Sequence, residues 1–305
     1  MLQYVAKRIL LTLPVLVGIL IITFLLTRLS GDPTDLILPP DAAESAREAF
    51  RDKHGLDRSI WIQFLNFSWL AAQGDFGTSL RFGESAVTLV VERLGATTEL
   101  AVAALVLSIV VGVPAGVIAA YWRNRPVDVA IRILTLFGQA VPSFYLGILS
   151  IIIFAVWLDW LPTGGRGTWG QLLLPAVTLS LHIVALIARV TRSCMLDVLG
   201  QDYIRTARAK GLGENVVVWV HALRNAFIPV LTVIGLQVGF LMGGVIVTET
   251  VFAWPGVGRL AVQAIYARDF PVVQAVVLLF AMIFVVVNLV VDLLYAALDP
   301  RIGYK

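Results

Sequence analysis

The chain has 305 residues, of which 59% are hydrophobic and only 14% charged, and its formal net charge is +3. Soluble domains carry charge on about a quarter of their residues, so this composition excludes an ordinary soluble protein and places the chain in a membrane. A single cysteine, Cys194, excludes an internal disulfide and a cysteine-rich metal site.

Six apolar stretches meet or approach the length of about 20 residues that a transmembrane helix needs. In chain order they are 9–27, 100–121, 133–158, 172–188, 229–251 and 272–298. The first stretch follows Lys7 and Arg8, and no small-x-small cleavage site comes after it, which favours an uncleaved anchor over a signal peptide. We therefore expect an all-α integral membrane fold with six transmembrane helices.

The basic residues predict the orientation of these helices. If the N-terminus is cytoplasmic, the inner segments hold thirteen Lys and Arg residues and the two short outer loops hold three. The long first loop is left out of this comparison because long loops cross largely regardless of charge. This asymmetry predicts that both termini are cytoplasmic.

The predicted organisation has four parts: an N-terminal anchor span (1–28), an external loop region (29–99), a transmembrane core (100–298) and a cytoplasmic tail (299–305). In the external region, "DAAESAREAFRDKHG" predicts a helix with Asp41 as N-cap and Gly55 as its stop. The aromatic stripe of "SIWIQFLNFSWLAA" predicts packing against the membrane or a neighbouring helix, and docking of an external partner is the alternative.

Two smaller patterns concern the last two spans. The outer loop "VFAWPGVGRLAVQAIYARDFP" predicts a short interfacial helix with three aromatic residues at headgroup level: Trp254, Tyr266 and Phe270. In the fifth span, small residues recur every four positions and predict a face that another helix approaches closely: Gly235, Gly239 and Gly243.

Motifs for catalysis are missing from the sequence. There is no GxxxxGK[ST], no GxSxG and no HExxH, so we expect no catalytic residue and no metal site. A membrane protease built on Ser180 and His182 is disfavoured, because residues two apart point about 200° apart on a helix. We expect His182 to be a bundle-facing, hydrogen-bonded histidine.

Ionisable residues in the spans are few and lie near their ends. Glu249 closes the fifth span and Asp292 lies toward the end of the sixth. A self-sufficient proton-driven carrier or channel, the alternative function, would need such groups deep in the membrane. The energy source is therefore expected in another subunit. Polar candidates for the lining of a solute path are Gln237, Glu249 and Asn288.

The stretch "RTARAKGLGENVVVWVHALRNAFIPV" (205–230) interrupts the apolar pattern between the fourth and fifth spans. Ile204, Ala207 and Gly211 share one face of a short helix and suit insertion into a close-fitting cleft, and Gly211 can end that helix with a positive φ. The alternative is an ordinary basic loop. Three residues are expected at helix starts here: Asp202 and Asn215 as caps, and Pro229 in the first turn of the fifth span.

The same stretch resembles the signature of the inner-membrane permease subunits of ATP-binding-cassette importers, in the form found in the dipeptide/oligopeptide/nickel group. The general signature is Glu-Ala-Ala, three residues, Gly, nine residues, Ile-x-Leu-Pro. The matching positions here are Arg205, Thr206, Ala207, Gly211, His221, Leu223 and Arg224, with Pro229 five residues later. The glutamate and the terminal proline of the signature are thus replaced.

Four further stretches are similar to that group: "GDFGTSL" (74–80), "RLGATTELA" (93–101), "PSFYLGI" (142–148) and "VTETVFAWPGVGRL" (247–260). The short N-terminus resembles the "B" member of the permease pair, as in dipeptide permeases. The resemblance covers essentially the whole chain.

The resemblance implies a type I importer fold in the bacterial cytoplasmic membrane, with a coupling helix at about 202–213. It implies four kinds of partner: a second homologous permease, two ABC ATPases that bind ATP and Mg, an extracytoplasmic solute-binding protein and membrane lipid. No cofactor in this chain and no nucleic acid are expected. Relatives carry dipeptides, oligopeptides, glutathione, haem or chelated nickel. The residues implied in ATPase coupling are Thr206, Ala207, Gly211, Leu212 and Glu214.

Overall fold

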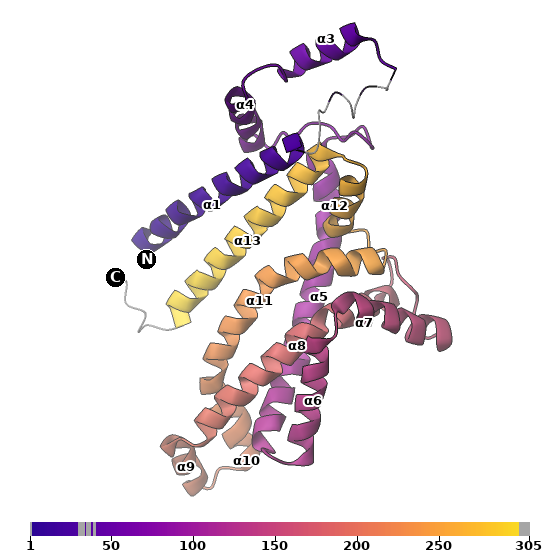
Figure 1. Cartoon of the computed structure of the whole chain (residues 1–305). Helices are drawn as coiled ribbons and strands as arrows, with labels where there is room; N and C mark the ends of the chain where they lie inside the picture. The colour runs from indigo at the N-terminus through magenta and orange to yellow at the C-terminus, as the bar shows by residue number, and fades with distance from the viewer. Residues whose placement is uncertain (1, 30–33, 35–37, 39–40, 299–305) are drawn as a thin grey trace. The chain divides into compact units, whose positions relative to one another are not determined.

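The computed structural model describes residues 2–29, 34, 38 and 41–298 (Figure 1). These residues form helices, and the only extended pairing among them is an isolated bridge between Thr78 and Ser85. The chain packs as two units. The first holds the chain up to Gly95 together with Gly256–Val285, and the second holds Ala96–Pro255 with the described residues after Val285.

The first unit contains α1 (Leu2–Leu29), α3 (Glu44–His54), α4 (Ile60–Ala72), the start of α5 (Ala86–Tyr121), α12 (Val257–Tyr266) and the start of α13 (Phe270–Leu298). Apolar side chains of α5, α12 and α13 form its core, among them Leu89, Leu260 and Val272. The short helix predicted in the last outer loop is therefore confirmed as α12, and burial of its apolar face holds it in place.

In the external region, the two predicted helices are present as α3 and α4. Gly55 ends α3 at φ 62°, as predicted, and its N–H bonds the carbonyls of Arg51 and Asp52. The prediction of Asp41 as N-cap is wrong. The helix begins at Glu44, Ala43 occupies the cap position, and no side chain there makes a capping hydrogen bond.

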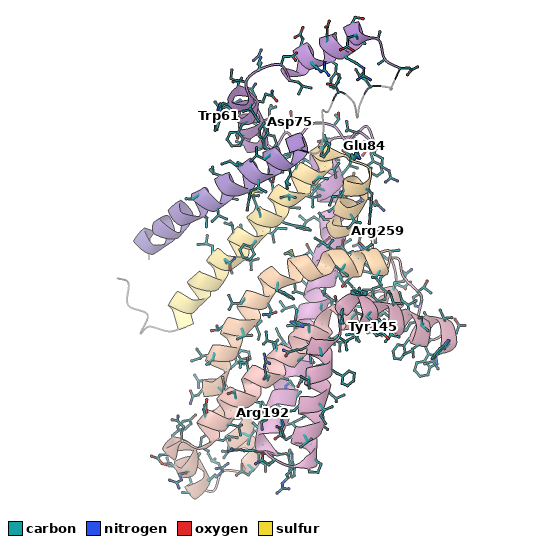
Figure 2. The ribbon with its side chains drawn as sticks, in the orientation of Figure 1. Trp61, Asp75, Glu84, Tyr145, Arg192 and Arg259 are labelled. Carbon is teal, nitrogen blue, oxygen red and sulfur yellow. The ribbon has the colours of Figure 1, made fainter. Side chains whose placement is uncertain are left out.

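Some aromatic residues of α4 are packed against α1 and others are exposed. Phe64 and Phe67 pack against Phe24 of α1, with ring centroids 5.5 and 5.8 Å away. Trp61 and Trp69 are exposed on this unit (Figure 2 labels Trp61). Packing against a neighbouring helix is thus confirmed for one side of the stripe.

The second unit is built around α8 (Trp169–Leu199), which contacts α6 (Pro126–Ala140), α7 (Ser143–Ser150) and α11 (Leu223–Val251). The π-helical stretch η1 (Ile151–Trp157) continues α7. The short helices α9 (Asp202–Ala209) and α10 (Glu214–Val216) and the π-helical η2 (Val217–Ala222) connect α8 to α11. Figure 1 shows α6, α8 and α11 running together, with α9 and α10 at one end.

Close approach of α5 to α8 depends on two glycines one helical turn apart. A Cβ on Gly116 would lie 2.5 Å from both the carbonyl oxygen of Ala188 and the Cβ of Thr191, and one on Gly112 would lie 3.0 Å from Ile187. At Gly243, on the glycine face of the fifth span, a Cβ would meet nothing within 4 Å among the described residues, so a close approach of another helix there stays a prediction. A glycine is needed where another helix packs closely against it, and the spacing of glycines in the sequence does not show where that happens.

Four described helical stretches are long and apolar enough to cross a membrane: α5, α8, the continuous run Glu214–Val251, and Phe270–Val290 within α13. A fifth crossing is obtained if α6 and α7–η1 form one broken span. In α1, the described apolar stretch Pro14–Leu26 is shorter. Six crossings and the orientation of the termini therefore stay predictions, and the tail 299–305 lies outside the described residues.

The third predicted span is not one straight helix. The chain breaks at Val141 and Pro142, and the axes on either side meet at 104°. Pro142 has no N–H to continue α6, and it disfavours the helical conformation of the residue before it. Val141 is accordingly extended, with φ −90° and ψ 129°. The apolar composition of 133–158 concealed this break.

Trp254 does not lie at an interface, as the sequence had suggested, but inside the second unit. Its side chain has no exposed surface, and its indole N–H donates to the carbonyl of Ala96 over 2.9 Å. A buried indole needs such a partner. Tyr266, by contrast, is exposed.

Candidate functional site

The turn that follows α9 is an exposed polar segment in the connection between α8 and α11. Gln201 occupies the N-cap position of α9 without a side-chain hydrogen bond, so the prediction that Asp202 caps this helix is wrong. Asp202 lies instead in the first turn, where its charge favours the helix dipole. Likewise, Gly213 rather than Asn215 precedes α10, and Pro229 lies inside α11.

Gly211 ends the α9 segment as predicted. Its φ is +79°, a conformation that glycine adopts without the steric cost other residues incur, and its N–H bonds the carbonyl of Arg208 over 2.9 Å. The turn is closed by an ion pair in which Arg208 Nε lies 2.6 Å from Glu214 Oε1. These contacts give the segment Thr206–Glu214 a defined shape on the surface.

One face of α9 packs against its own chain. Ile204 and Ala207 are buried and belong to the apolar core of the second unit, together with Met195 and Val217. The expectation that Ile204 and Ala207 form a face for insertion into a partner's cleft is therefore wrong. Both side chains anchor α9 to the bundle.

The other side of the segment is free to meet a partner. Thr206, Gly211, Leu212 and Glu214 are exposed. Tyr203 also links α9 to α11, because its hydroxyl accepts a hydrogen bond from the Asn225 amide over 2.7 Å. The exposed turn is thus attached to α11 through this hydrogen bond and to both α8 and α11 through η2, which α9 contacts.

A buried ion pair connects α6 to α8 in the same unit. Arg192 donates through Nε and Nη2 to the two carboxylate oxygens of Asp128, over 2.7 and 2.8 Å. Asp128 has no exposed surface and also accepts from the backbone N–H of Asn124 over 2.9 Å. Figure 2 labels Arg192. No local sequence pattern marks either residue as part of an ion pair. Their separation of 64 positions hides the pair.

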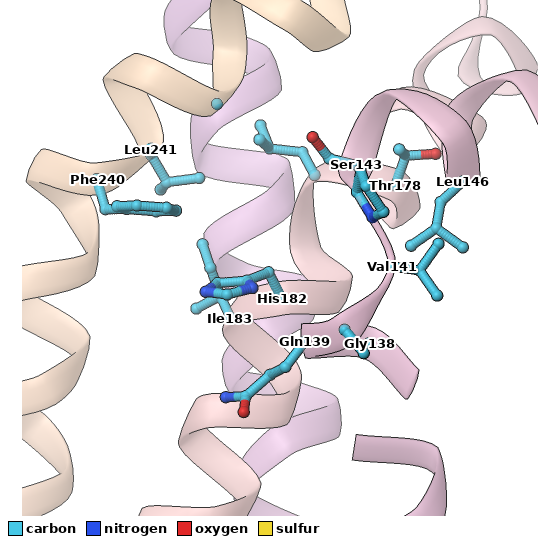
Figure 3. A pocket seen from close by; sticks show the side chains of 14 residues that line it. Gly138, Gln139, Val141, Ser143, Leu146, Thr178, His182, Ile183, Phe240 and Leu241 are labelled. Atoms are coloured by element: carbon cyan, nitrogen blue, oxygen red, sulfur yellow. The ribbon is translucent and has the colours of Figure 1, made fainter. Parts of the chain in front are cut away.

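A partly open cavity of about 320 Å³ lies at the break between α6 and α7 and is bordered by α8 and α11. Figure 3 shows the side chains of Gln139, Ser143, Thr178, His182 and Phe240 around it. The imidazole of His182 stacks on the Phe240 ring, with centroids 5.5 Å apart and planes 23° apart.

The cavity changes the interpretation of His182. No described residue forms a hydrogen bond with its imidazole, so the expectation of a hydrogen-bonded histidine is wrong. A catalytic pair with Ser180 is not formed either, because the Ser180 hydroxyl donates to the carbonyl of Val177 over 2.8 Å.

The polar residues suggested for a solute path do not line this cavity. Glu249 has no exposed surface, and its carboxylate accepts from the Thr97 hydroxyl over 2.6 Å. In this conformation Glu249 is a packing residue. Gln237 and Asn288 are half-buried, and their place in a path stays a prediction.

Two further polar contacts were not predicted from the sequence. In the second unit, Arg166 lies 2.6 Å from Glu99 in an exposed ion pair. In the first unit, the buried carboxylate of Asp269 accepts from the Ser79 hydroxyl and from the backbone N–H of Leu80. The second contact fixes the turn of "GDFGTSL" on the residue that precedes α13.

The comparisons with known proteins agree with a membrane protein built of several long apolar helices. Residues 112–304 match the family described as "Binding-protein-dependent transport system inner membrane component". The glutathione transport system permease protein GsiC of Escherichia coli (strain K12) is 46% identical over 306 aligned positions, covering the whole of both chains. The corresponding protein of Shigella flexneri serotype 5b (strain 8401) is 45% identical over the same span.

Solved structures show the same fold at low sequence identity. An inward-facing MetNI methionine ABC transporter matches with a TM-score of 0.58 at 19% identity, over 69% of this chain and 96% of that chain. An amino acid ABC transporter crystallised with histidines matches with a TM-score of 0.55 at 15% identity, over 69% of this chain and 94% of the other.

The family match and the full-length similarity, together with the apolar spans, therefore define a multi-pass permease subunit of a bacterial ABC importer, located in the inner membrane. Within that class, the chain belongs to the binding-protein-dependent transport system inner membrane component family.

Proposed function

We propose that this permease subunit carries small peptides and related solutes into the cell, and that the turn Thr206–Glu214 couples it to an ATPase. The cargo class rests on the peptide-type resemblance of the whole chain and on its similarity to permease proteins of glutathione transport systems. The coupling role rests on one observation above all. Ile204 and Ala207 hold one side of α9 in the apolar core, while Thr206 and the turn after it are exposed.

Coupling then follows from rigid-body mechanics. When ATP closes the ATPase pair, a permease segment bound in a groove on the ATPase surface moves with it. Here Thr206, Gly211 and Leu212 contact the ATPase, Glu214 lies at the rim, and Ala207 anchors the turn to the bundle. Because α9 packs against η2, which contacts both α8 and α11, and because Tyr203 is hydrogen-bonded to Asn225 of α11, a displacement of the turn moves those helices as a unit. Two such permeases form the path, and an external binding protein delivers the solute.

Reconstitution tests this function. The chain is co-purified with its associated subunits, these are identified by mass spectrometry, and the complex is placed in proteoliposomes with the binding protein. We expect ATP-dependent uptake of glutathione or dialanine that requires all subunits. Uptake by vesicles that contain only this chain would contradict the proposal and would favour a self-sufficient carrier or channel.

A further inference from the structure

The cavity at the α6–α7 break is lined without any charged side chain. Its fourteen lining residues contain no Asp, Glu, Lys or Arg, yet four of them carry polar groups: Gln139, Ser143, Thr178 and His182. Each of these groups offers a neutral N–H or O–H donor. A cavity lined by hydrogen-bond donors and by no carboxylate suits an anionic or hydrogen-bond-accepting group.

Three of these polar side chains have no hydrogen-bond partner among the described residues: Ser143, Thr178 and His182. Thr178 is only 3% exposed. A threonine in a helix normally satisfies its hydroxyl by donating to a carbonyl one turn earlier, as Thr248 does to Gly244. Ser143 and His182 are half-buried, and Thr178 Oγ1 is not one of the fully buried unpaired atoms of the described residues, so all three side chains can reach a group that enters the cavity.

The fourth donor is oriented by a neighbouring cation. Arg189 Nη1 donates to Gln139 Oε1 over 3.1 Å. A guanidinium only donates, so this contact fixes the oxygen of the amide and leaves the amide NH₂ to donate elsewhere.

The helix break adds backbone donors at the same place. Pro142 is the N-cap residue of α7, and Pro142 and Ser143 both line the cavity. The first N–H groups of a helix have no partner within it and carry the positive end of the helix dipole. Broken membrane helices use such half-helix starts to hold anionic solute groups.

We propose that this cavity binds the terminal carboxylate of a transported peptide. The hydroxyls of Ser143 and Thr178, the imidazole N–H of His182 and the Gln139 amide donate to it. Phe240 holds the imidazole ring by stacking. The volume of about 320 Å³ is at the lower end of small-ligand pockets, roughly 300–1,000 Å³. It therefore accommodates one end of a peptide. This inference rests on the proposed function.

The test uses the assembled transporter in proteoliposomes, with its ATPases, sister permease and binding protein. Uptake of dialanine and of glutathione is compared with uptake of dialanine amide, which lacks the carboxylate. His182→Phe keeps the aromatic stacking and removes the N–H donor. Because a hydrogen bond to a charged group is worth about a tenfold effect, we expect dialanine uptake to fall about tenfold and dialanine amide uptake to change less than about twofold.

Further variants separate recognition from folding. Ser143→Ala is expected to lower dialanine uptake, as His182→Phe does. His182→Asn retains an N–H donor and is expected to restore part of that uptake. Ser150→Ala is the matched control, because the Ser150 hydroxyl donates to Gly147 in the same helix and does not line the cavity. Uptake and basal ATP hydrolysis should both be unchanged in Ser150→Ala.

The outcomes distinguish the two proposals. A wild-type complex that imports none of the probes overturns the proposed function and this inference with it. A wild-type complex that imports dialanine, while His182→Phe and Ser143→Ala lower acid and amide uptake equally or not at all, overturns the carboxylate site alone.

Discussion

At the scale of single residues, the two glycines of the α9 turn differ in what they require of the backbone. Gly211 has φ +79°, whereas Gly213 has φ −61° and ψ 143°. Neither has an atom within 4 Å of the position of a Cβ. Any effect of substitution at these two sites therefore comes from backbone conformation and not from a clash.

We expect Gly211→Val to uncouple transport and to leave membrane insertion intact. A left-handed conformation costs a non-glycine residue about 1–2 kcal/mol, equivalent to a factor of about 5–30, so the turn changes shape. ATP-driven uptake in proteoliposomes should fall by a factor of about 5–30. Gly213→Val, at an extended position that valine favours, is the control. Equal uptake in the two variants would exclude a role for the Gly211 conformation.

The Asp128–Arg192 pair is a second residue-scale feature. Removing Arg192 takes both short contacts from the buried Asp128 and leaves it only the exposed Arg132, whose Nε lies 3.4 Å from Oδ1. The loss is therefore at most about 3–5 kcal/mol, the cost of breaking a buried ion pair. We expect Arg192→Ala to lower the thermal unfolding temperature of the detergent-solubilised chain strongly. The exposed pair Arg166–Glu99 provides the control, because exposed ion pairs contribute about 0–1 kcal/mol. A small shift in Arg192→Ala, similar to that of Arg166→Ala, would show that the buried pair does not hold α6 on α8.

At the scale of elements, the α5–α8 contact depends on the absence of side chains. Ala188 and Thr191 approach Gly116 through a backbone oxygen and a Cβ, neither of which can rotate away. The helices must therefore separate to admit even a methyl group. In a closely packed bundle such a separation spreads to neighbouring contacts.

Gly116→Ala is accordingly expected to destabilise the chain by about 1–3 kcal/mol, the usual cost of overpacking. Gly243→Ala lies in a helix with open space around the new Cβ and is expected to be neutral or stabilising by up to about 1 kcal/mol. Thermal unfolding of both variants in the same detergent measures the difference. Loss of stability in Gly243→Ala with none in Gly116→Ala would contradict the assigned packing.

At the scale of the whole molecule, the proposed mechanism requires the α9 turn to face the cytoplasm and α12 to face the opposite side. Leu212 and Tyr266 are exposed reporters for these two regions. After Cys194→Ser, we expect Leu212→Cys to react with a membrane-impermeant thiol reagent only in inside-out vesicles and Tyr266→Cys only in right-side-out vesicles. Reaction of Leu212→Cys from outside would remove the basis of ATPase coupling.

The sequence by itself determined the class of the protein and the location of its polar turn. Apolar stretches long enough to cross a membrane, Gly211 as a helix stop and the family signature are all local patterns, and local patterns are sufficient for them. The helix-cap predictions at Asp41, Asp202 and Asn215 were wrong because a side chain of the right type caps a helix only if the chain places it in reach of free N–H groups.

Only the tertiary structure decided which distant residues meet. The pairing of Asp128 with Arg192, the burial of Ile204 and Ala207, and the cavity beside His182 all depend on how α6, α8 and α11 pack. The bend at Val141 was also hidden, because an apolar run has the same composition whether its helix is straight or broken. Helix packing is governed by contacts between residues far apart in the chain, and no local periodicity records them.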